Sequence, residues 1–305
     1  MKKLKIGILC LKPENYSNGR LMEQFRLRGH EIEHIDYTKC DLYVGKDATD
    51  VFYEGRSLKY LDAIIPRVAI EHNFYALAVV RHFEAMNCYS LNGSIAIGRA
   101  RDKLRSLQIL AQHNLPIPKS AISNSTLNSQ QLIDSLNGAP IVIKLIEGMQ
   151  GKGTVLAETN QAAVSVVEAF SAIKTNLIVQ EYIAESKGKD IRVFVVGNEI
   201  IACMQREAKE GDFRSNLHRG GKSSKVKLTA VEKKIALAAV KQLKLEVAGV
   251  DLISSNEGPL ILEVNSSPGL EGIEKTSEVN VADKIVSFLE KDIAKFRKSK
   301  VKEQI

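Results

Sequence analysis

The first third of the chain alternates between short apolar strands and amphipathic helices, and this alternation restricts the fold more than any other feature. Strands are expected over 5–9, 32–35 and 63–65, and helical periods over 18–28 and 74–86. Strands separated by helices indicate parallel βαβ units, so we expect a small parallel sheet covered by helices. No G-x-G-x-x-G motif follows the first strand, so the fingerprint of a dinucleotide-binding fold is missing.

Beyond this region, a helix over 102–113 ends at Leu115-Pro116-Ile117-Pro118, because proline disfavours helix in the residue before it. We place a domain boundary there. Strands dominate the last third, apart from a helix expected over 230–243. With 305 residues, the chain is long enough for about two domains.

The composition is that of a soluble globular protein and excludes several other classes. Hydrophobic residues make up 44% of the chain and charged residues 26%, which argues against a disordered or fibrous protein. No run of roughly 20 apolar residues is present, so no transmembrane helix is expected. The four cysteines are scattered without paired spacing, which is typical of reduced thiols in a cytoplasmic protein.

A surplus of positive charge, +7 overall, favours acidic partners such as nucleotide phosphates, nucleic acid or a carboxylate-rich peptide. Part of the surplus is local, because six basic residues and one acid lie between Lys291 and Lys302. We interpret this segment as a solvated C-terminal end, since no RNA-binding aromatic signature accompanies it.

Two strand-like runs near the end of the chain carry the strongest chemical signal. The runs 250–253 and 261–265 are joined by a turn-rich segment of five residues centred on position 257. With that centre, Asp251 lies directly opposite Glu263, and Asn265 projects from the same face. Facing carboxylates are costly unless a cation neutralises them, and such hard oxygen ligands suit Mg²⁺ or Mn²⁺. The alternative is a surface hairpin whose polar face happens to hold acids.

A glycine-rich loop follows the strand 141–146. Its glycines at 148, 151 and 153 could bring backbone N–H groups close to a phosphate, although turn geometry alone also explains glycines there. Lys144 favours the phosphate interpretation, because a lysine inside an apolar strand is a poor choice unless it meets phosphate oxygens. The loop is not a Walker A motif, since no Lys-Ser/Thr follows and no helix begins there.

A polar loop over 210–221 is bounded by glycines and rich in guanidinium and amide donors. Such donors could stabilise charge on a transferring phosphoryl group or a carboxylate. An ordinary solvated loop is the alternative.

Together, these residues resemble the RimK family of ATP-grasp carboxylate–amine ligases over essentially the whole chain, to about residue 285. The resemblance rests on Lys144, the glycine loop and the runs 180–183, 212–221 and 263–274. It implies an α/β fold in which a Rossmann-like pre-ATP-grasp domain at 1–100 precedes an ATP-grasp fold. The ATP-grasp part would comprise a small subdomain with the glycine loop at 101–185 and a C-terminal subdomain with the metal site at 186–290. A flexible basic tail at 291–305 would follow.

The resemblance also implies a role for each of a set of polar residues. The nucleotide would be bound by Lys103, Lys144, Gly151, Gly153, Glu181, Tyr182, Asp190, Arg214, Ser215 and Asn216, with Glu181 and Tyr182 at the adenine and Asp190 at the ribose. Two divalent ions would be held by Asp251, Glu263 and Asn265, with Glu263 bridging them. The catalytic cations near the γ-phosphate or the substrate carboxylate would be Arg192, Arg206 and Arg214.

The implied activity uses ATP and two Mg²⁺ (or Mn²⁺) ions to turn a carboxylate into an acylphosphate, which the amine of L-glutamate then attacks. The acceptor would be the C-terminus of a small-subunit ribosomal protein, and poly-α-glutamate is a further possible product. A cytoplasmic homo-oligomer is expected, with no need for nucleic acid or a membrane.

Two alternatives stay open from the sequence. The same fold could join an amino acid to a small-molecule cofactor or a carrier protein, because fold does not settle substrate. A non-catalytic basic protein that binds the ribosome or RNA through its tail is the other.

Overall fold

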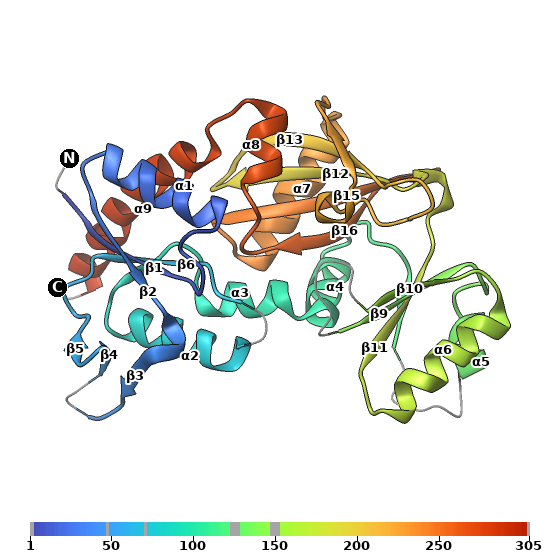
Figure 1. Cartoon of the computed structure of the whole chain (residues 1–305), viewed down its shortest axis with the longest axis horizontal. Coiled ribbons are helices and arrows are strands. Elements are labelled where there is room, and N and C mark those ends of the chain that lie inside the picture. The colour runs from blue at the N-terminus through green and yellow to red at the C-terminus, as the bar shows by residue number, and fades with distance from the viewer. Residues whose placement is uncertain (1–2, 47–48, 70–71, 123–128, 147–152, 304–305) are drawn as a thin grey trace.

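The computed structural model describes residues 3–46, 49–69, 72–122, 129–146 and 153–303, with side chains up to residue 299. Figure 1 shows the elements as an elongated arrangement, with the N-terminal unit at one end and the sheet containing β9–β11 at the other. Within the described ranges, no helix is long and apolar enough to cross a bilayer.

The N-terminal unit is built on a parallel sheet with the strand order β2-β1-β6-β7. Its strands are β1 (Lys5–Leu9), β2 (Glu31–Ile35), β6 (Ala63–Pro66) and β7 (Tyr89–Ser90). Because successive side chains point to opposite faces, Ile6 and Ile8 pack on one side with α1 (Tyr16–Leu27), and Leu9 and Ile64 pack on the other with α2 (Asn73–Ala85). A small antiparallel sheet of β3 (Cys40–Tyr43), β4 (Asp50–Tyr53) and β5 (Arg56–Ser57) extends the second side.

Two consecutive helices, α3 (Ser94–Arg101) and α4 (Lys103–Gln112), lead to a central antiparallel sheet with the order β10-β9-β11-β8. Its strands are β8 (Ser120–Ala121), β9 (Ile141–Leu145), β10 (Thr154–Ala157) and β11 (Leu177–Glu181). The helices α5 (Ser129–Asp134) and α6 (Asn160–Ala172) cover the sheet and close a separate hydrophobic core.

The largest sheet has the order β14-β13-β12-β15-β16 and is antiparallel throughout. Its strands are β12 (Lys189–Val196), β13 (Glu199–Glu207), β14 (Lys222–Ser224), β15 (Val247–Ser255) and β16 (Gly258–Asn265). One face packs on α7 (Ala230–Leu243), and the other packs on α8 (Glu271–Ser277) and α9 (Val281–Glu303). The core beneath α9 continues into the N-terminal sheet, so these two units share one apolar interior.

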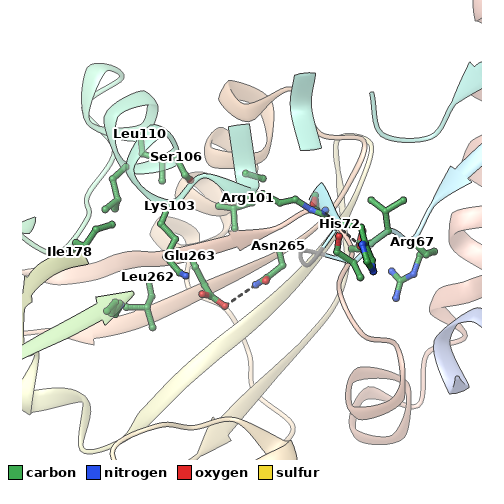
Figure 2. A pocket seen from close by; sticks show the side chains of 18 of the residues that line it. Arg67, His72, Arg101, Lys103, Ser106, Leu110, Ile178, Leu262, Glu263 and Asn265 are labelled. Atoms are coloured by element: carbon green, nitrogen blue, oxygen red, sulfur yellow. Dashed lines mark hydrogen bonds between the residues drawn. The ribbon is translucent and has the colours of Figure 1, made fainter. Parts of the chain in front are cut away.

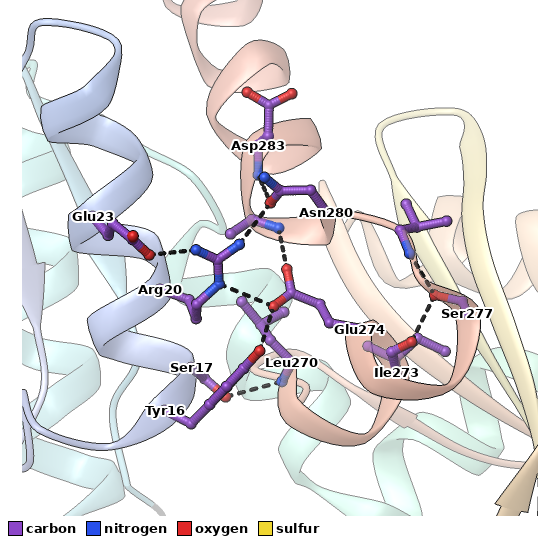
Figure 3. A network of polar contacts seen from close by, with 12 residues as sticks. Tyr16, Ser17, Arg20, Glu23, Leu270, Ile273, Glu274, Ser277, Asn280 and Asp283 are labelled. Carbon is purple, nitrogen blue, oxygen red and sulfur yellow. Dashed lines mark hydrogen bonds and ion pairs between the residues drawn. The ribbon is translucent and has the colours of Figure 1, made fainter.

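A polar network fastens the N-terminal helix α1 to the end of the large sheet (Figure 3). The carboxylate of Glu274 in α8 accepts hydrogen bonds from Tyr16 Oη (3.0 Å), Arg20 Nε (3.3 Å) and the backbone N–H of Ala282 (3.0 Å). Ser17 Oγ accepts a further bond from the backbone N–H of Leu270 (2.9 Å). The segment that follows β16 is therefore held against the N-terminal unit.

The expected α/β architecture is present, and most predicted elements lie within two residues of their expected bounds. The helix expected over 18–28 begins earlier, at Tyr16, because the side chain of Asn15 accepts a hydrogen bond from the N–H of Ser17 and caps the helix there. The four cysteines are free thiols, as expected.

The C-terminal segment differs from the flexible tail expected from residue 291. The helix α9 continues to Glu303, because Ile293 is buried and Phe296 packs edge-on against Tyr89 with ring centroids 5.6 Å apart. Asp292 also accepts a hydrogen bond from Tyr89 Oη (2.9 Å). These contacts extend the apolar face of α9 onto the N-terminal sheet.

Candidate active site

A pocket of about 640 Å³ lies where the N-terminal unit, α3, α4, the central sheet and the end of β16 meet. Figure 2 shows its three parts in a row. Ile178 and Leu262 form an apolar end, Lys103, Glu263 and Asn265 occupy the middle, and Arg67 and His72 lie at the other end. Of the predicted site residues that the structure describes, Lys103, Lys144, Glu263 and Asn265 line this pocket.

The β15–β16 ribbon brings Asp251 opposite Glu263, as the sequence predicts, but the turn that joins the two strands differs from the expected one. The turn is tight, with Ser255 paired to Gly258, and the register from this turn would align Asp251 with Leu262. An irregularity after Asp251 adds one residue to β16, which moves Glu263 into the pairing position. The bulge therefore re-aims the carboxylate of Glu263 toward the pocket.

The middle of the pocket offers oxygen ligands for a cation. Asn265 Nδ2 donates to Glu263 Oε1 (3.0 Å), which shows that the two side chains share one face of β16. Although Glu263 is open to the pocket, the enclosing protein limits its hydration and, together with the charge of Asp251, raises the pKa of Glu263. A carboxylate in such a place is stabilised by a positive ion.

Asp251 lies deeper, with 2% of its surface exposed, and two arginines hold it. Arg192 donates to both of its oxygens through Nε and Nη2, and Arg206 Nη2 lies 2.9 Å from Oδ2. Burial alone would raise the pKa of Asp251, but the charges of Arg192 and Arg206 outweigh it and lower that pKa to about 2. Asp251 is paired directly with Glu263 across the ribbon, so the two carboxylates adjoin each other. The donor set thus fits a divalent ion held by Glu263 and Asn265, with Asp251 completing it.

Asp190, predicted at the ribose, belongs to the same buried cluster. Arg206 donates to both of its oxygens at 2.7 and 2.5 Å, and Ser215 Oγ donates at 2.6 Å. Asp190 and Arg206 are each 5% exposed. The structure therefore places Asp190, Arg192 and Arg206 behind Asp251 rather than along the pocket.

Two lysines face the middle of the pocket from different elements. Lys144 on β9 donates from Nζ to Gln180 Oε1 (2.6 Å) on the adjacent strand β11, and burial lowers its pKa to about 8. Lys103, at the start of α4, donates from Nζ to the carbonyl oxygens of Leu145 (3.0 Å) and Ile146 (2.8 Å), and burial lowers its pKa as well. Both ammonium groups line the pocket near Glu263, so they add positive charge to its middle.

The glycine loop is described only at its end. Gly151 lies outside the described residues, as does the glycine at 148. Gly153 has φ +73°, and a Cβ atom there would lie 2.6 Å from Leu145 Cδ1. Both the backbone conformation and the space therefore require glycine at this position.

The other predicted nucleotide residues lie beside the pocket rather than in its wall. Glu181 Oε1 accepts from the backbone N–H of Lys119 (2.7 Å), and the Tyr182 ring meets Phe213 edge-on at 6.3 Å. Arg214 donates to Asp212, and through Nη1 to the carbonyl of Thr154 (3.4 Å), so the polar loop reaches β10. Asn216 begins the short 3₁₀ turn Leu217–Arg219.

Comparison with protein families identifies this arrangement. A model of the RimK-like ATP-grasp domain matches residues 100–289, and one of the RimK PreATP-grasp domain matches residues 4–97. The chain belongs to the RimK family of ATP-grasp ligases. It is therefore an ATP-dependent ligase with a pre-ATP-grasp domain followed by an ATP-grasp domain, and the expected family and fold are confirmed.

Relatives in the RimK family cover nearly the whole chain. A probable alpha-L-glutamate ligase of Picosynechococcus sp. is 53% identical over 95% of this chain and 97% of the relative. A probable alpha-L-glutamate ligase 2 of Shewanella frigidimarina is 50% identical over 97% of this chain and 99% of the relative.

Solved structures agree in fold at lower identity. The ATP-grasp ligase PsnB, complexed with a phosphomimetic variant of its minimal precursor, Mg and ADP, has a TM-score of 0.71 and 19% identity over 95% of this chain and 98% of that one. A RimK domain ATP-grasp protein of Sphaerobacter thermophilus has a TM-score of 0.70 and is 20% identical, over 93% of this chain and 98% of that one.

Sequence reasoning missed Arg67 and His72, which line the pocket from the pre-ATP-grasp domain of this RimK-family chain, and Arg101, which ends α3. Arg67 directly follows β6, at the carboxyl edge of a parallel sheet, where ligands of α/β proteins commonly bind. A search for polar residues just after the predicted strand 63–65 would have found it.

Proposed function

We propose that this ligase joins L-glutamate to the C-terminal carboxylate of a protein acceptor, a small-subunit ribosomal protein, and that it can extend the product as poly-α-glutamate. The supporting observation is the pocket itself, in which Lys103 and Lys144 face the pair Glu263 and Asn265. Glutamate is proposed because relatives that are about half identical over nearly the whole chain are named probable alpha-L-glutamate ligases. A peptide acceptor is in keeping with PsnB, which was solved with its precursor.

The reaction would proceed in two balanced steps. An oxygen of the acceptor carboxylate attacks the γ-phosphorus of ATP, the bond to the β-phosphate oxygen breaks, and ADP leaves. The neutral amine of glutamate then attacks the acyl carbon, inorganic phosphate leaves, and the amine loses a proton to solvent. Lys103 and Lys144 would hold the phosphates through both steps, because each presents its charge to the middle of the pocket.

Magnesium would be held by Glu263 and Asn265, with Asp251 supplying the remaining carboxylate position. A bound Mg²⁺ neutralises charge on the transferring phosphoryl group. Arg192 and Arg206 would act through Asp251, since they fix the orientation of its carboxylate and keep it ionised.

The remaining nucleotide assignments stay part of the proposal. Glu181 and Tyr182 would border the adenine, and Arg214, Ser215 and Asn216 would border the acylphosphate from the polar loop. Gly151 and Gly153 would let the loop between β9 and β10 approach the phosphates.

The test is a mass spectrum of a small-subunit ribosomal protein after incubation with the enzyme, ATP, Mg²⁺ and glutamate. We expect masses increased by whole glutamyl residues, and ADP released in step with them. Glu263→Gln should abolish the gain in mass and leave the fold intact. Glu257→Gln, an exposed residue at the turn of the same ribbon, is the matched control and should behave as wild type. Turnover only on a small molecule, with no protein or peptide extended, would refute the proposed acceptor.

A further inference from the structure

The pre-ATP-grasp end of the pocket is strongly cationic. Among the residues that the structure describes, the pocket is lined by five cationic side chains and one carboxylate, that of Glu263; the cations are Lys12, Arg67, Arg101, Lys103 and Lys144. Lys103 and Lys144 lie at the middle, where the phosphates are proposed to bind. Lys12 and Arg67 come from the pre-ATP-grasp domain, and neither is assigned to the phosphates. Positive charge that ATP does not use favours a second anionic ligand.

Arg67 is the best-placed of these cations to bind that ligand. Its Nε donates to Asn18 Oδ1 (3.2 Å), and its Nη1 donates to the carbonyl oxygen of Pro268 (2.9 Å). Both acceptors are neutral, and none of the ion pairs among the described residues involves Arg67. A guanidinium has five N–H donors, so these two bonds leave three for another partner.

The surroundings of Arg67 hold the side chain in place and leave its charge uncompensated. Asn18 is buried, and its Nδ2 donates to the carbonyl of Lys12 (2.8 Å), which turns its Oδ1 toward Arg67. Burial and the nearby charge of Arg101 lower the pKa of Arg67 to about 10, which still leaves it protonated at neutral pH. Arg67 is half-buried at the pocket and has no counter-ion among the described residues, so an anionic substrate would compensate its charge.

The position of Arg67 relative to the metal ligands decides which anion it meets. Pro268, which accepts its Nη1 bond, follows Asn265 by three residues, and Ser267 Oγ donates to the carbonyl of Pro66 (3.3 Å). In Figure 2, Glu263 and Asn265 lie between the apolar end of the pocket and Arg67. A nucleotide with its base at the apolar end would present its γ-phosphate between those two residues and Arg67. An amine that approaches the acyl carbon from the side opposite the nucleotide would arrive from the side of Arg67.

We propose that Arg67 is a specificity-determining residue that binds a carboxylate of the incoming amino-acid substrate. This inference rests on the proposed function, because it assumes that the amino acid attacks an activated acceptor. The planar fork of Arg67 matches a carboxylate bidentately. Glutamate carries two carboxylates, and either would satisfy the geometry.

The experiment measures steady-state ADP release with a fixed peptide acceptor and three amino acids. Glutamate has both carboxylates, glutamine lacks the side-chain carboxylate, and glutamate α-amide lacks the α-carboxylate. Wild type is compared with Arg67→Gln, with Arg67→Lys, which keeps the charge but loses the fork, and with Arg81→Gln. Arg81 is an exposed arginine of α2 and is the matched control.

We expect Arg67→Gln to raise KM for glutamate about 10- to 100-fold, as expected for losing a charge-assisted bidentate bond, with KM for ATP unchanged. Arg67→Lys should be intermediate, and Arg81→Gln should equal wild type. The variant should also lose discrimination against one analogue, and the identity of that analogue shows which carboxylate Arg67 binds.

Three results would overturn the inference. They are an unchanged KM for glutamate in Arg67→Gln, an increase confined to ATP or to the acceptor, and an equal loss for all three amino acids. Thermal melting of each variant shows whether the fold is retained. Failure of the proposed function is a separate outcome, because wild type would then show no glutamate-dependent ADP release.

Discussion

Arg206 tests whether the arginines act behind Asp251 or along the substrate. Replacing it with methionine removes two bonds to Asp190, at 2.7 and 2.5 Å, and the contact with Asp251 at 2.9 Å. Asp251 keeps Arg192 as a counter-ion, but Asp190 keeps only the hydroxyl of Ser215. The substitution therefore leaves the carboxylate of Asp190 without a counter-ion, whereas the carboxylate of Asp251 still has one.

The expected loss follows from that count. Removing one partner of a buried ion pair costs about 3–5 kcal/mol, so Arg206→Met should lower the free energy of unfolding by that amount. In a domain as large as the ATP-grasp domain, residues 100–289, each kcal/mol of lost stability lowers Tm by about 2–4 °C. The Tm of the variant should therefore be about 6–20 °C lower than that of wild type. The matched control is Arg56→Met, because Arg56 pairs with Glu33 while its side chain is 52% exposed, and such pairs contribute about 0–1 kcal/mol.

Thermal unfolding is followed by circular dichroism, since the chain has no tryptophan. The sign of the pH dependence adds a second readout. Burial raises the pKa of Asp190 even though the charge of Arg206 opposes this, and removing Arg206 should raise that pKa further, so the folded state gains a proton first as the pH falls. Part of the lost stability should therefore return as the pH is lowered and Asp190 takes up its proton. A variant that melts within 2 °C of wild type, or that matches Arg56→Met, would refute the buried-cluster reasoning.

Two further predictions concern the glycine loop and its lysine. Burial lowers the pKa of Lys144 to about 8, so its ammonium loses its proton as the pH rises from 7 to 9 and the affinity for ADP should fall. Lys144→Arg should remove this pH dependence of ADP binding. An affinity of the wild type that does not change with pH would contradict the assignment. Gly153→Ala should lower Tm more than Gly211→Ala. Both glycines have a positive φ, but a Cβ atom at Gly153 would lie 2.6 Å from Leu145 Cδ1, whereas a Cβ atom at Gly211 would meet nothing within 4 Å. Equal decreases in Tm would refute the steric argument.

The secondary structure could be predicted from local sequence patterns. The pairing of Asp251 with Glu263 was also predicted, but from a turn that differs from the one in the structure. The helix expected over 230–243 is α7, because its capping box, Thr229 with Glu232, and its apolar period are both local signals. The Asp251–Glu263 pairing was expected from a five-residue loop but arises from a tight turn and a bulge. A bulge depends on packing and twist across the whole sheet, which no local pattern records.

Some residues of the candidate site could likewise be predicted from the sequence, and others could not. Lys144 and Glu263 stood out because each is a charged residue in an apolar strand, and both line the pocket. Arg192 and Arg206 carry the same signal, yet they pair with buried aspartates, because a charged residue in a strand serves a neighbouring carboxylate as readily as a ligand. Arg67 could have been found as the first polar residue after the strand 63–65, but its contact with the carbonyl of Pro268 depends on how the pre-ATP-grasp domain meets the segment after β16.

The most direct test of the account follows the oxygen atoms of the acceptor. A short peptide that the enzyme extends is labelled with ¹⁸O in its C-terminal carboxylate and incubated with ATP, Mg²⁺ and glutamate. If the carboxylate is activated as an acylphosphate, one ¹⁸O atom moves to inorganic phosphate for each peptide bond formed, and ADP is the nucleotide product. Unlabelled phosphate alongside extended peptide, or AMP with pyrophosphate as products, would contradict the account.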